Sequence, residues 1–215
     1  MAGASQKPYV IGIVGGIASG KSLAAKILSD LGAETIDADK IGHEVLEKTS
    51  VINLLVTKLG REILVEGSQP AKIDRQRLGG VVFGEEAKSV DNLQQLEAIV
   101  HPEIHAEAIR RLRRICERDD APRAIILDAP LLLEANWQPS CDYIIFLDSP
   151  RDLRLERALQ RGWTEEDFDA REAAQMSLNR KRSHATHLVR SENEQQLRQE
   201  LQRLWDELGT VSKSN

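Results

Sequence analysis

An eight-residue stretch near the start of the chain, Gly15 to Ser22, constrains the fold more than any other. Its sequence, Gly-Gly-Ile-Ala-Ser-Gly-Lys-Ser, fits the phosphate-loop pattern of a glycine, four residues, a second glycine, lysine and serine. An apolar run over residues 9–14 precedes the loop, and good helix formers over 23–31 follow it. A buried strand that leads through a glycine-rich loop into a helix is the context that confirms this motif. A glycine-rich turn that only caps the helix is the disfavoured alternative.

The loop predicts a binding site for a nucleoside triphosphate. Glycines let the backbone curve around phosphate oxygens and direct N–H groups toward them, and the helix N-terminus attracts an anion. Lys21 can reach the outer phosphates, and the Ser22 hydroxyl can ligate Mg²⁺. The residues expected to surround the phosphates are Gly16, Ile17, Ala18, Ser19, Gly20, Lys21, Ser22 and Leu23.

Composition excludes several classes of protein. A hydrophobic fraction of 41% and a charged fraction of 29% are typical of a soluble globular chain, and a formal net charge of −5 argues against general nucleic-acid binding. Cys116 and Cys141 have neither metal-ligand nor redox-pair spacing, so we expect reduced thiols. Because no apolar run reaches the roughly 20 residues that span a bilayer, and residues 1–8 lack an apolar signal core, we expect a cytoplasmic protein without membrane, nucleic-acid or obligate protein partners.

Strands and helices alternate along the chain, which predicts an α/β fold with a parallel sheet and helices on both faces. The five expected strands cover residues 9–14, 33–37, 124–128, 143–148 and 187–190. Parallel sheets of this kind bind ligands at the carboxyl ends of their strands. We therefore expect the phosphate loop, Asp37, Asp39, Asp128 and Asp148 to lie together at that edge.

A long helical stretch, about 51–116, separates the second and third strands. We expect a helix over 40–48, one or two helices before residue 64, a helix over 75–82 capped by Asp74, and another over 85–100 that His101-Pro102 ends before a further helix begins. The stretch is longer than a crossover needs, so we interpret it as an inserted subdomain that covers the acceptor. A packing elaboration without a ligand is an equal alternative.

A second helical region, about 151–184, follows the fourth strand. Three arginines there recur at spacings of three and four and share one helix face: Arg154, Arg157 and Arg161. A further helix opening at Glu165 carries Arg171 and Gln175 and ends in a basic run, 180–182. We interpret the region as a lid whose arginines close over phosphates, the alternative being a solvated face with local ion pairs. An amphipathic helix over 194–208 completes a single domain of residues 9–208, and the ends, 1–8 and 209–215, are expected to be loose.

Taken together, these motifs resemble those of dephospho-coenzyme A kinases from about residue 9 to 190. The segments that carry the resemblance are the phosphate loop, 36–39, 74–78 with 82–83, 96–104, 130–134, Gln175 and Lys181. Such enzymes have a P-loop kinase fold and phosphorylate the ribose 3′-hydroxyl of dephospho-coenzyme A with ATP and Mg²⁺, the last step of coenzyme A synthesis. The alternatives are a kinase for another small alcohol or nucleoside monophosphate, and a nucleotide-binding switch, although a guanine-binding Asn-Lys-x-Asp motif is absent from the sequence.

The catalytic residues implied are Asp39, Lys21 and Arg157. The resemblance points to Asp39, the second aspartate of its pair, and a carboxylate beside the phosphate loop suits a base for the hydroxyl proton; an N-cap of a helix starting at Lys40 is the alternative. Arg157 and Arg161 are further phosphate ligands, and Asp37 or Asp128 is the candidate for holding Mg²⁺ through water.

Residues implied to bind the acceptor are Asp39, Arg75, Arg77, Phe83, His101, Leu132 and Glu134. From the residues alone, the favoured interpretation is packing in the subdomain core for Phe83 and capping of the helix break for His101. The chain departs from the family pattern at five positions: Ala18, Leu23, Thr186, Arg190 and Ser191. The last three leave the selectivity for the ATP base open.

Overall fold

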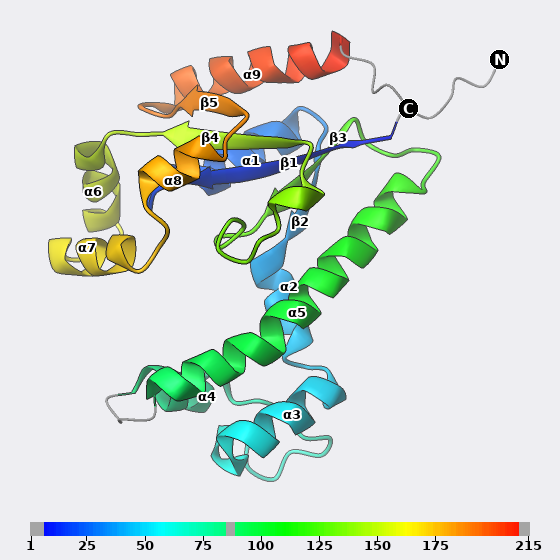
Figure 1. Ribbon diagram of the computed structural model, residues 1–215, viewed down its shortest axis with the longest axis vertical. Coiled ribbons are helices and arrows are strands. Elements are labelled where there is room, and N and C mark those ends of the chain that lie inside the picture. The colour runs from blue at the N-terminus through cyan, green and yellow to red at the C-terminus, as the bar shows by residue number, and fades with distance from the viewer. Residues whose placement is uncertain (1–6, 85–88, 211–215) are drawn as a thin grey trace. The chain divides into compact units, whose positions relative to one another are not determined.

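The computed structural model describes residues 7–84 and 89–210, with side chains up to Leu208. The chain divides into two compact units (Figure 1). One unit holds the residues up to Asp37 together with those from Arg111 onward, and the other holds Ala38–Arg110.

A five-stranded sheet forms the centre of the first unit, as the alternating pattern predicted. Its strands are β1 (Tyr9–Gly15), β2 (Glu34–Asp37), β3 (Ala124–Asp128), β4 (Tyr143–Asp148) and β5 (His187–Arg190). All neighbouring pairs are parallel, in the order β2-β3-β1-β4-β5. The strand before the phosphate loop is therefore the middle strand, and the loop leaves the sheet at its centre.

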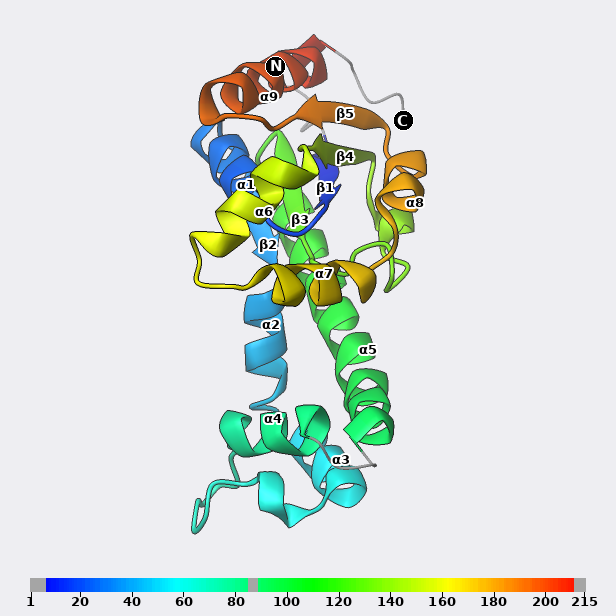
Figure 2. The ribbon, with the colours of Figure 1, turned by 90° about the vertical axis from the view of Figure 1, so that its left-hand side faces the viewer.

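Helices lie on both faces of this sheet (Figures 1 and 2). Helices α1 (Lys21–Asp30) and α9 (Glu194–Thr210) pack against each other on one face, and α8 (Leu178–Ser183) lies on the other. Successive side chains of a strand point to opposite faces, so Tyr9, Ile11 and Ile13 join the core beneath α1 and α9. The expected inward face of the last helix is confirmed, because Leu197, Leu201, Leu204, Trp205 and Leu208 are all buried.

The carboxyl ends of the strands meet at one edge, as expected. The register pairs Asp37 with Asp128, Gly15 with Leu147, and Asp148 with Arg190. The end of the phosphate-loop strand thus lies in one row with the carboxylates that end β2, β3 and β4. Asp39 belongs to the second unit.

The second unit is helical and has its own core. It contains α2 (Ala38–Val45), α3 (Thr49–Leu59), a short 3₁₀ turn (Arg61–Ile63), α4 (Arg75–Phe83) and most of α5 (Ser89–Cys116). The side chains of Ile41, Val45, Leu55 and Ile63 are completely buried. Asp74 caps α4, accepting hydrogen bonds from the backbone N–H groups of Gln76 and Arg77 at 3.0 and 3.1 Å, so that prediction is confirmed.

Two boundary predictions in this unit were wrong. Helix α5 runs unbroken through Pro102, although an interior proline costs about 3 kcal/mol. Helix-forming residues on both sides, anchored by buried Val100 and Ala108, outweigh that cost, and His101 therefore caps no break. Helix α2 begins at Ala38, so Asp39 lies in its first turn and is not the N-cap of a helix starting at Lys40. The first four residues predicted for this long helix, 85–88, lie outside the described part of the chain.

The predicted lid region contains three short helices instead of two. Helix α6 (Arg151–Leu159) is followed by α7 (Glu165–Ala173), and the basic run lies on the separate helix α8. Thr164 and Asp167 form a reciprocal capping box at the start of α7, and the Ser177 hydroxyl accepts from the backbone of Arg180 at the start of α8. The sequence signal that we missed is the N-cap residue Ser177. Its hydroxyl accepts from a backbone N–H that would bond to a backbone carbonyl if one helix continued through this point.

A small apolar cluster joins α6 and α7 to the phosphate loop. Phe168 of α7 is fully buried and packs with Ile17 and Ala18 of the loop and Ala158 of α6. The loop is thus part of a packed core, and α7 is anchored to it. Among the described residues, no helix has the length and apolar character needed to cross a bilayer.

Replacing Phe168 with alanine should lower the free energy of unfolding by about 3–5 kcal/mol, because it empties a fully buried site. The control Leu159→Ala removes a side chain of α6 that is 49% exposed, and should cost less than about 1 kcal/mol. Urea unfolding followed by tryptophan fluorescence measures both, because all three tryptophans belong to the first unit. Equal losses in the two variants would contradict the packing described.

Candidate active site

The phosphate loop is held in an unusual backbone conformation. Ala18 has φ of 56° and Gly20 has φ of 96°. The left-handed region costs an L-residue about 1–2 kcal/mol and glycine little. A glycine at position 20 suits this geometry, whereas Ala18 adopts it only because the surroundings hold it there.

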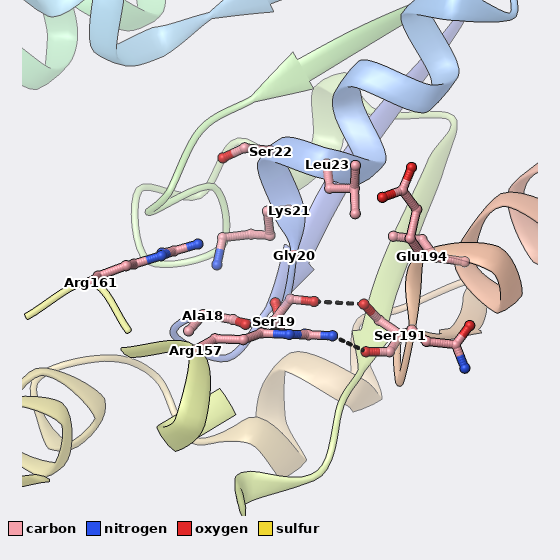
Figure 3. A pocket seen from close by; sticks show the side chains of 12 residues that line it. Ala18, Ser19, Gly20, Lys21, Ser22, Leu23, Arg157, Arg161, Ser191 and Glu194 are labelled. Carbon is pink, nitrogen blue, oxygen red and sulfur yellow. Dashed lines mark hydrogen bonds between the residues drawn. The ribbon is translucent and has the colours of Figure 1, made fainter. Parts of the chain in front are cut away.

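Side chains from outside the loop bind its carbonyl groups. Arg157 of α6 donates through Nη1 to the Ala18 carbonyl at 3.3 Å, and the Ser191 hydroxyl donates to the Ser19 carbonyl at 2.8 Å. The other nitrogen of the same guanidinium, Nη2, donates to the carbonyls of Ser191 and Glu192 at 3.0 and 3.1 Å. Figure 3 shows how Arg157 and Ser191 meet on one side of the loop. Arg157 therefore joins the loop to the turn between β5 and α9.

Lys21 is mostly buried among charged groups of both signs. Its ammonium group donates to the Gly16 carbonyl at 3.0 Å and reaches the Gly15 carbonyl at 3.5 Å. Burial, and after it the positive charge of Lys181, lowers the pKa of Lys21 to about 8, while Asp128 opposes the shift. These surroundings destabilise the charged form of Lys21. An anion bound nearby would stabilise that form, so the site favours anion binding.

Another buried polar group in the loop points to a missing partner. The Ser19 side chain is completely buried, and among residues 7–84 and 89–208 its hydroxyl finds no hydrogen-bond partner. Buried hydroxyls are usually bonded to protein, water or ligand. The loop therefore has donor capacity that a phosphate or an ordered water can use.

A cavity of about 420 Å³ opens beside the loop. It is lined by Ala18–Leu23, Arg157, Arg161, Ser191, Asn193, Glu194 and Leu197. Figure 3 shows Lys21 and Arg161 extending into this space. The structure thus brings together most of the residues predicted at the phosphates, and a volume in this range suits a nucleotide. Gly16 and Ile17 belong to the same loop but do not line the cavity.

Sequence reasoning missed three residues of the cavity wall: Asn193, Glu194 and Leu197. Asn193 and Glu194 closely follow the carboxyl end of β5, and Leu197 is one turn into α9, so the rule that ligands bind at that edge could have identified the first two. Ser191, one of the departures from the family pattern, also lines the cavity. Arg157 keeps its charge there, although burial and neighbouring Arg161 lower its pKa.

The donors present fit a metal ion that arrives with phosphate. Ser22 is exposed at the start of α1, and Asp37 and Asp128 are paired at the ends of neighbouring strands. Within the described ranges no group of three or more His, Cys, Asp or Glu side chains could hold a metal alone. Mg²⁺ often takes only one or two protein ligands and completes its shell with phosphates and water, so this sparse set is compatible with it.

The predicted acceptor arginines line two different cavities of the second unit. Arg75 bonds to Nε2 of His43 at 2.8 Å in a cavity of about 410 Å³, which also includes Glu47 and Lys72. Arg77 lines a separate cavity of about 670 Å³, and it lies 3.5 Å from the Asp74 carboxylate. No sequence signal identified His43, a lone histidine on an amphipathic helix.

The remaining predicted acceptor residues have varied surroundings. Phe83 is 74% exposed at the end of α4, so the favoured interpretation that it packs in the core was wrong. Leu132 is 1% exposed and packs beside Gly12, which argues against a contact between its side chain and an acceptor. Glu134 accepts from the Met176 N–H at 3.0 Å and pairs with buried Lys181 at 3.3 Å, so it anchors the connection between α7 and α8.

Arg171 of α7, expected to act with the lid arginines, stacks on Trp163 instead. Its guanidinium carbon lies 4.4 Å from the ring centroid, a cation–π contact. Arg171 is not among the residues that line the described cavity beside the loop.

Comparison with known proteins identifies the family. The family model described as dephospho-CoA kinase matches residues 9–198. The chain belongs to the dephospho-CoA kinase family. A dephospho-CoA kinase of Bacillus cereus is 36% identical over 185 residues, which cover 85% of this chain and 88% of the relative.

Solved structures agree with this membership of the dephospho-CoA kinase family. The Thermus thermophilus protein TT1252 superposes with a TM-score of 0.74 at 29% identity, covering 94% of this chain and 99% of that one. Dephospho-CoA kinase from Campylobacter jejuni gives a TM-score of 0.64 at 25% identity, covering 97% and 100%. The predicted P-loop kinase fold is therefore confirmed.

In this dephospho-CoA kinase family member, the departures near β5 have different consequences. The Thr186 hydroxyl bonds to the Ile144 backbone and to the His187 ring, which fixes the start of β5 at the edge of the sheet. Ser191, in contrast, binds the phosphate loop directly. Only the second departure touches the cavity.

The kinase should lose ATP affinity as the pH rises through about 8, the pKa of Lys21. Below that pH the free protein carries the lysine charge, and above it the neutral amine no longer attracts phosphate. The ratio kcat/KM for ATP reports the free enzyme and should fall by up to about tenfold per pH unit on the alkaline side. Bound triphosphate raises the pKa of Lys21, so kcat should persist to higher pH.

A matched variant, Lys21→Arg, provides the control because a guanidinium stays charged throughout this range. Its kcat/KM profile should lack the alkaline limb near pH 8, whatever its absolute activity. An identical limb in both proteins would assign the titration to another group.

Proposed function

We propose that this protein transfers the γ-phosphoryl group of ATP to the 3′-hydroxyl of dephospho-coenzyme A, giving coenzyme A and ADP in the last step of coenzyme A biosynthesis. The observation that carries the proposal is the dephospho-CoA kinase family match over residues 9–198. A phosphate loop at the centre of the sheet edge, beside a nucleotide-sized cavity, supports it.

The loop and its arginines hold the triphosphate. During transfer, negative charge spreads over the oxygens of the moving phosphoryl group, and fixed positive groups stabilise it. Lys21 exchanges its present carbonyl acceptors, Gly15 and Gly16, for phosphate oxygens. Arg161 approaches from the opposite wall (Figure 3). Arg157 bonds to the Ala18 and Ser191 carbonyls. We retain it as a catalytic candidate because it lines the same cavity.

Asp39 is the proposed general base. The acceptor oxygen forms a bond to the γ-phosphorus, the bond from that phosphorus to the β–γ bridging oxygen breaks, and the hydroxyl proton passes to the Asp39 carboxylate. Its place in the first turn of α2, two residues after β2, supports the role, as does its exposed side chain. A correctly placed base contributes about 10²–10⁴ in rate.

Mg²⁺ is the proposed cofactor, held by the Ser22 hydroxyl with Asp37 or Asp128 acting through water. When bound with ATP, it would neutralise phosphate charge. The chain's own contribution is to fix Ser22 at the start of α1 and the two carboxylates at neighbouring strand ends.

We propose that the second unit binds the acceptor and that the lid region, about 151–184, covers ATP. Arg75 is a better candidate for an acceptor phosphate than Arg77. A phosphate can displace the His43 ring from Arg75, whereas Arg77 already lies near the carboxylates of Asp74 and Glu66. His101 and Phe83 stay proposed contacts to the acceptor.

Dephospho-coenzyme A should support rapid ADP formation by the protein with Mg²⁺ and ATP. A site built to hydrogen-bond its substrate rejects incomplete analogues strongly, so nucleoside monophosphates should react at least about 10²-fold more slowly. A coupled ADP assay and mass detection of coenzyme A measure this, with Lys21→Ala as the inactive control. A faster reaction with a nucleoside monophosphate or another alcohol would assign a different acceptor.

Replacing Asp39 with asparagine should lower kcat by about 10²–10⁴, because the amide cannot accept the proton. ATP affinity should stay within about threefold, since the phosphate loop is untouched. Glu44→Gln, an acid-to-amide change elsewhere on α2, is the matched control and should keep kcat. Unchanged turnover in Asp39→Asn would remove this residue from the proposed proton transfer.

A further inference from the structure

A buried arginine beneath the phosphate loop has no part in the phosphoryl transfer described above. Arg154 of α6 is 2% exposed. A Cβ atom placed on Gly16 would lie 2.6 Å from its Nη1 atom, so the guanidinium lies directly against the loop backbone. Burying a charge is unfavourable unless partners compensate for lost water. The position therefore implies specific partners.

Those partners lie in three different segments. Arg154 donates through Nε to the Ser149 carbonyl at 3.1 Å and through Nη1 to the Ile17 carbonyl at 3.4 Å. It forms an ion pair with Glu172 of α7, and its guanidinium carbon lies 5.4 Å from the centroid of the Phe168 ring. One side chain thus connects the turn after β4, the phosphate loop and α7.

These contacts orient the amides of the loop. Three consecutive carbonyls, at Ile17, Ala18 and Ser19, accept from Arg154, Arg157 and Ser191 respectively. In a trans peptide the C=O group and the following N–H group point in opposite directions. Holding each carbonyl therefore directs the next N–H away from its partner side chain, and one of these groups, the Ser19 N–H, donates to the Gly16 carbonyl at 3.3 Å. The two arginines fix the peptide groups on both sides of Ala18, the residue in the left-handed conformation.

We propose that Arg154 is a positioning residue for nucleotide binding and that Glu172 keeps it in place, so that α7 and the phosphate loop are coupled through one ion pair. The proposal rests on the ATP site of the proposed function, and adds α7 to the elements that determine ATP affinity. Without Glu172, the buried guanidinium would turn toward another acceptor and release the Ile17 carbonyl. The loop would then have to be reordered by each nucleotide that binds.

Equilibrium binding of ATP to Glu172→Gln tests the coupling. The amide keeps the shape of the side chain and removes its charge, so the dissociation constant for ATP should rise about tenfold, within the usual range for coupled sites. KM for dephospho-coenzyme A should not change. Arg154→Lys keeps a charge but loses the forked geometry, and should weaken ATP binding in the same direction.

A neighbouring exposed ion pair supplies the matched control. Arg151 of α6 donates to Glu165 of α7 at 3.2 Å, and the Glu165 side chain is 56% exposed. Glu165→Gln makes the same chemical change between the same two helices without touching the loop. It should leave ATP affinity as in the natural protein, because exposed pairs contribute little.

Hydrogen–deuterium exchange of the peptide covering residues 15–23 gives a readout independent of catalysis. In Glu172→Gln these amides should exchange faster than in Glu165→Gln, although both substitutions lie on α7. A lower melting temperature with unchanged ATP affinity and unchanged loop exchange would show a purely structural pair and overturn the proposal. If Glu172→Gln does not fold, the same two measurements on Arg154→Lys decide.

The outcome is separable from that of the proposed function, because ATP binding is measured without acceptor. Natural protein that binds ATP but does not phosphorylate dephospho-coenzyme A would refute the proposed function alone. Equal ATP affinity and equal loop exchange in the natural protein and in Glu172→Gln would refute only the ion-pair coupling.

Discussion

The phosphate loop keeps its shape because side chains hold its carbonyl groups from outside. A loop with Ala18 in the left-handed region is not stable on its own. Arg157 and Ser191 bind two of its carbonyls, and Phe168 packs against its apolar side chains. The strand that precedes the loop and the helix that follows it place its ends. These lateral contacts decide where its amides point.

The cost of this arrangement is a concentration of positive charge. Burial, together with the nearby charges of Lys181 and Arg154, lowers the pKa of Lys21. Carboxylates offset part of the repulsion, since Glu134 pairs with Lys181 and Glu172 pairs with Arg154. The balance leaves the inside of the loop attractive to an anion while the surrounding helices stay folded.

The sheet and the phosphate loop could be predicted from local sequence more fully than the helices around them could be. Apolar runs bounded by proline or glycine identified β1, β3 and β4, because such runs need burial on both faces. The short strands β2 and β5 are partly exposed and were inferred from the alternation of strands and helices. The continuity of α5 through Pro102 could not be predicted, since packing decides it, whereas the Ser177 cap that separates α7 from α8 was present in the sequence and was missed. Arg154 and Glu172 lie on the successive helices α6 and α7, so no spacing rule within one helix predicts their ion pair.

The last strand and helix shape one wall of the nucleotide cavity, whereas the phosphates are held by a loop near the other end of the chain. Asn193 precedes α9, while Glu194 and Leu197 lie in its first turns, and the remaining length of the helix packs against α1. Asn193 and Glu194 are exposed, so substitutions there need not disturb the packed part of the helix, whereas Leu197 is buried in the core. This wall of the cavity can therefore change in sequence without any change in the phosphate loop, which belongs to a separate segment of the chain.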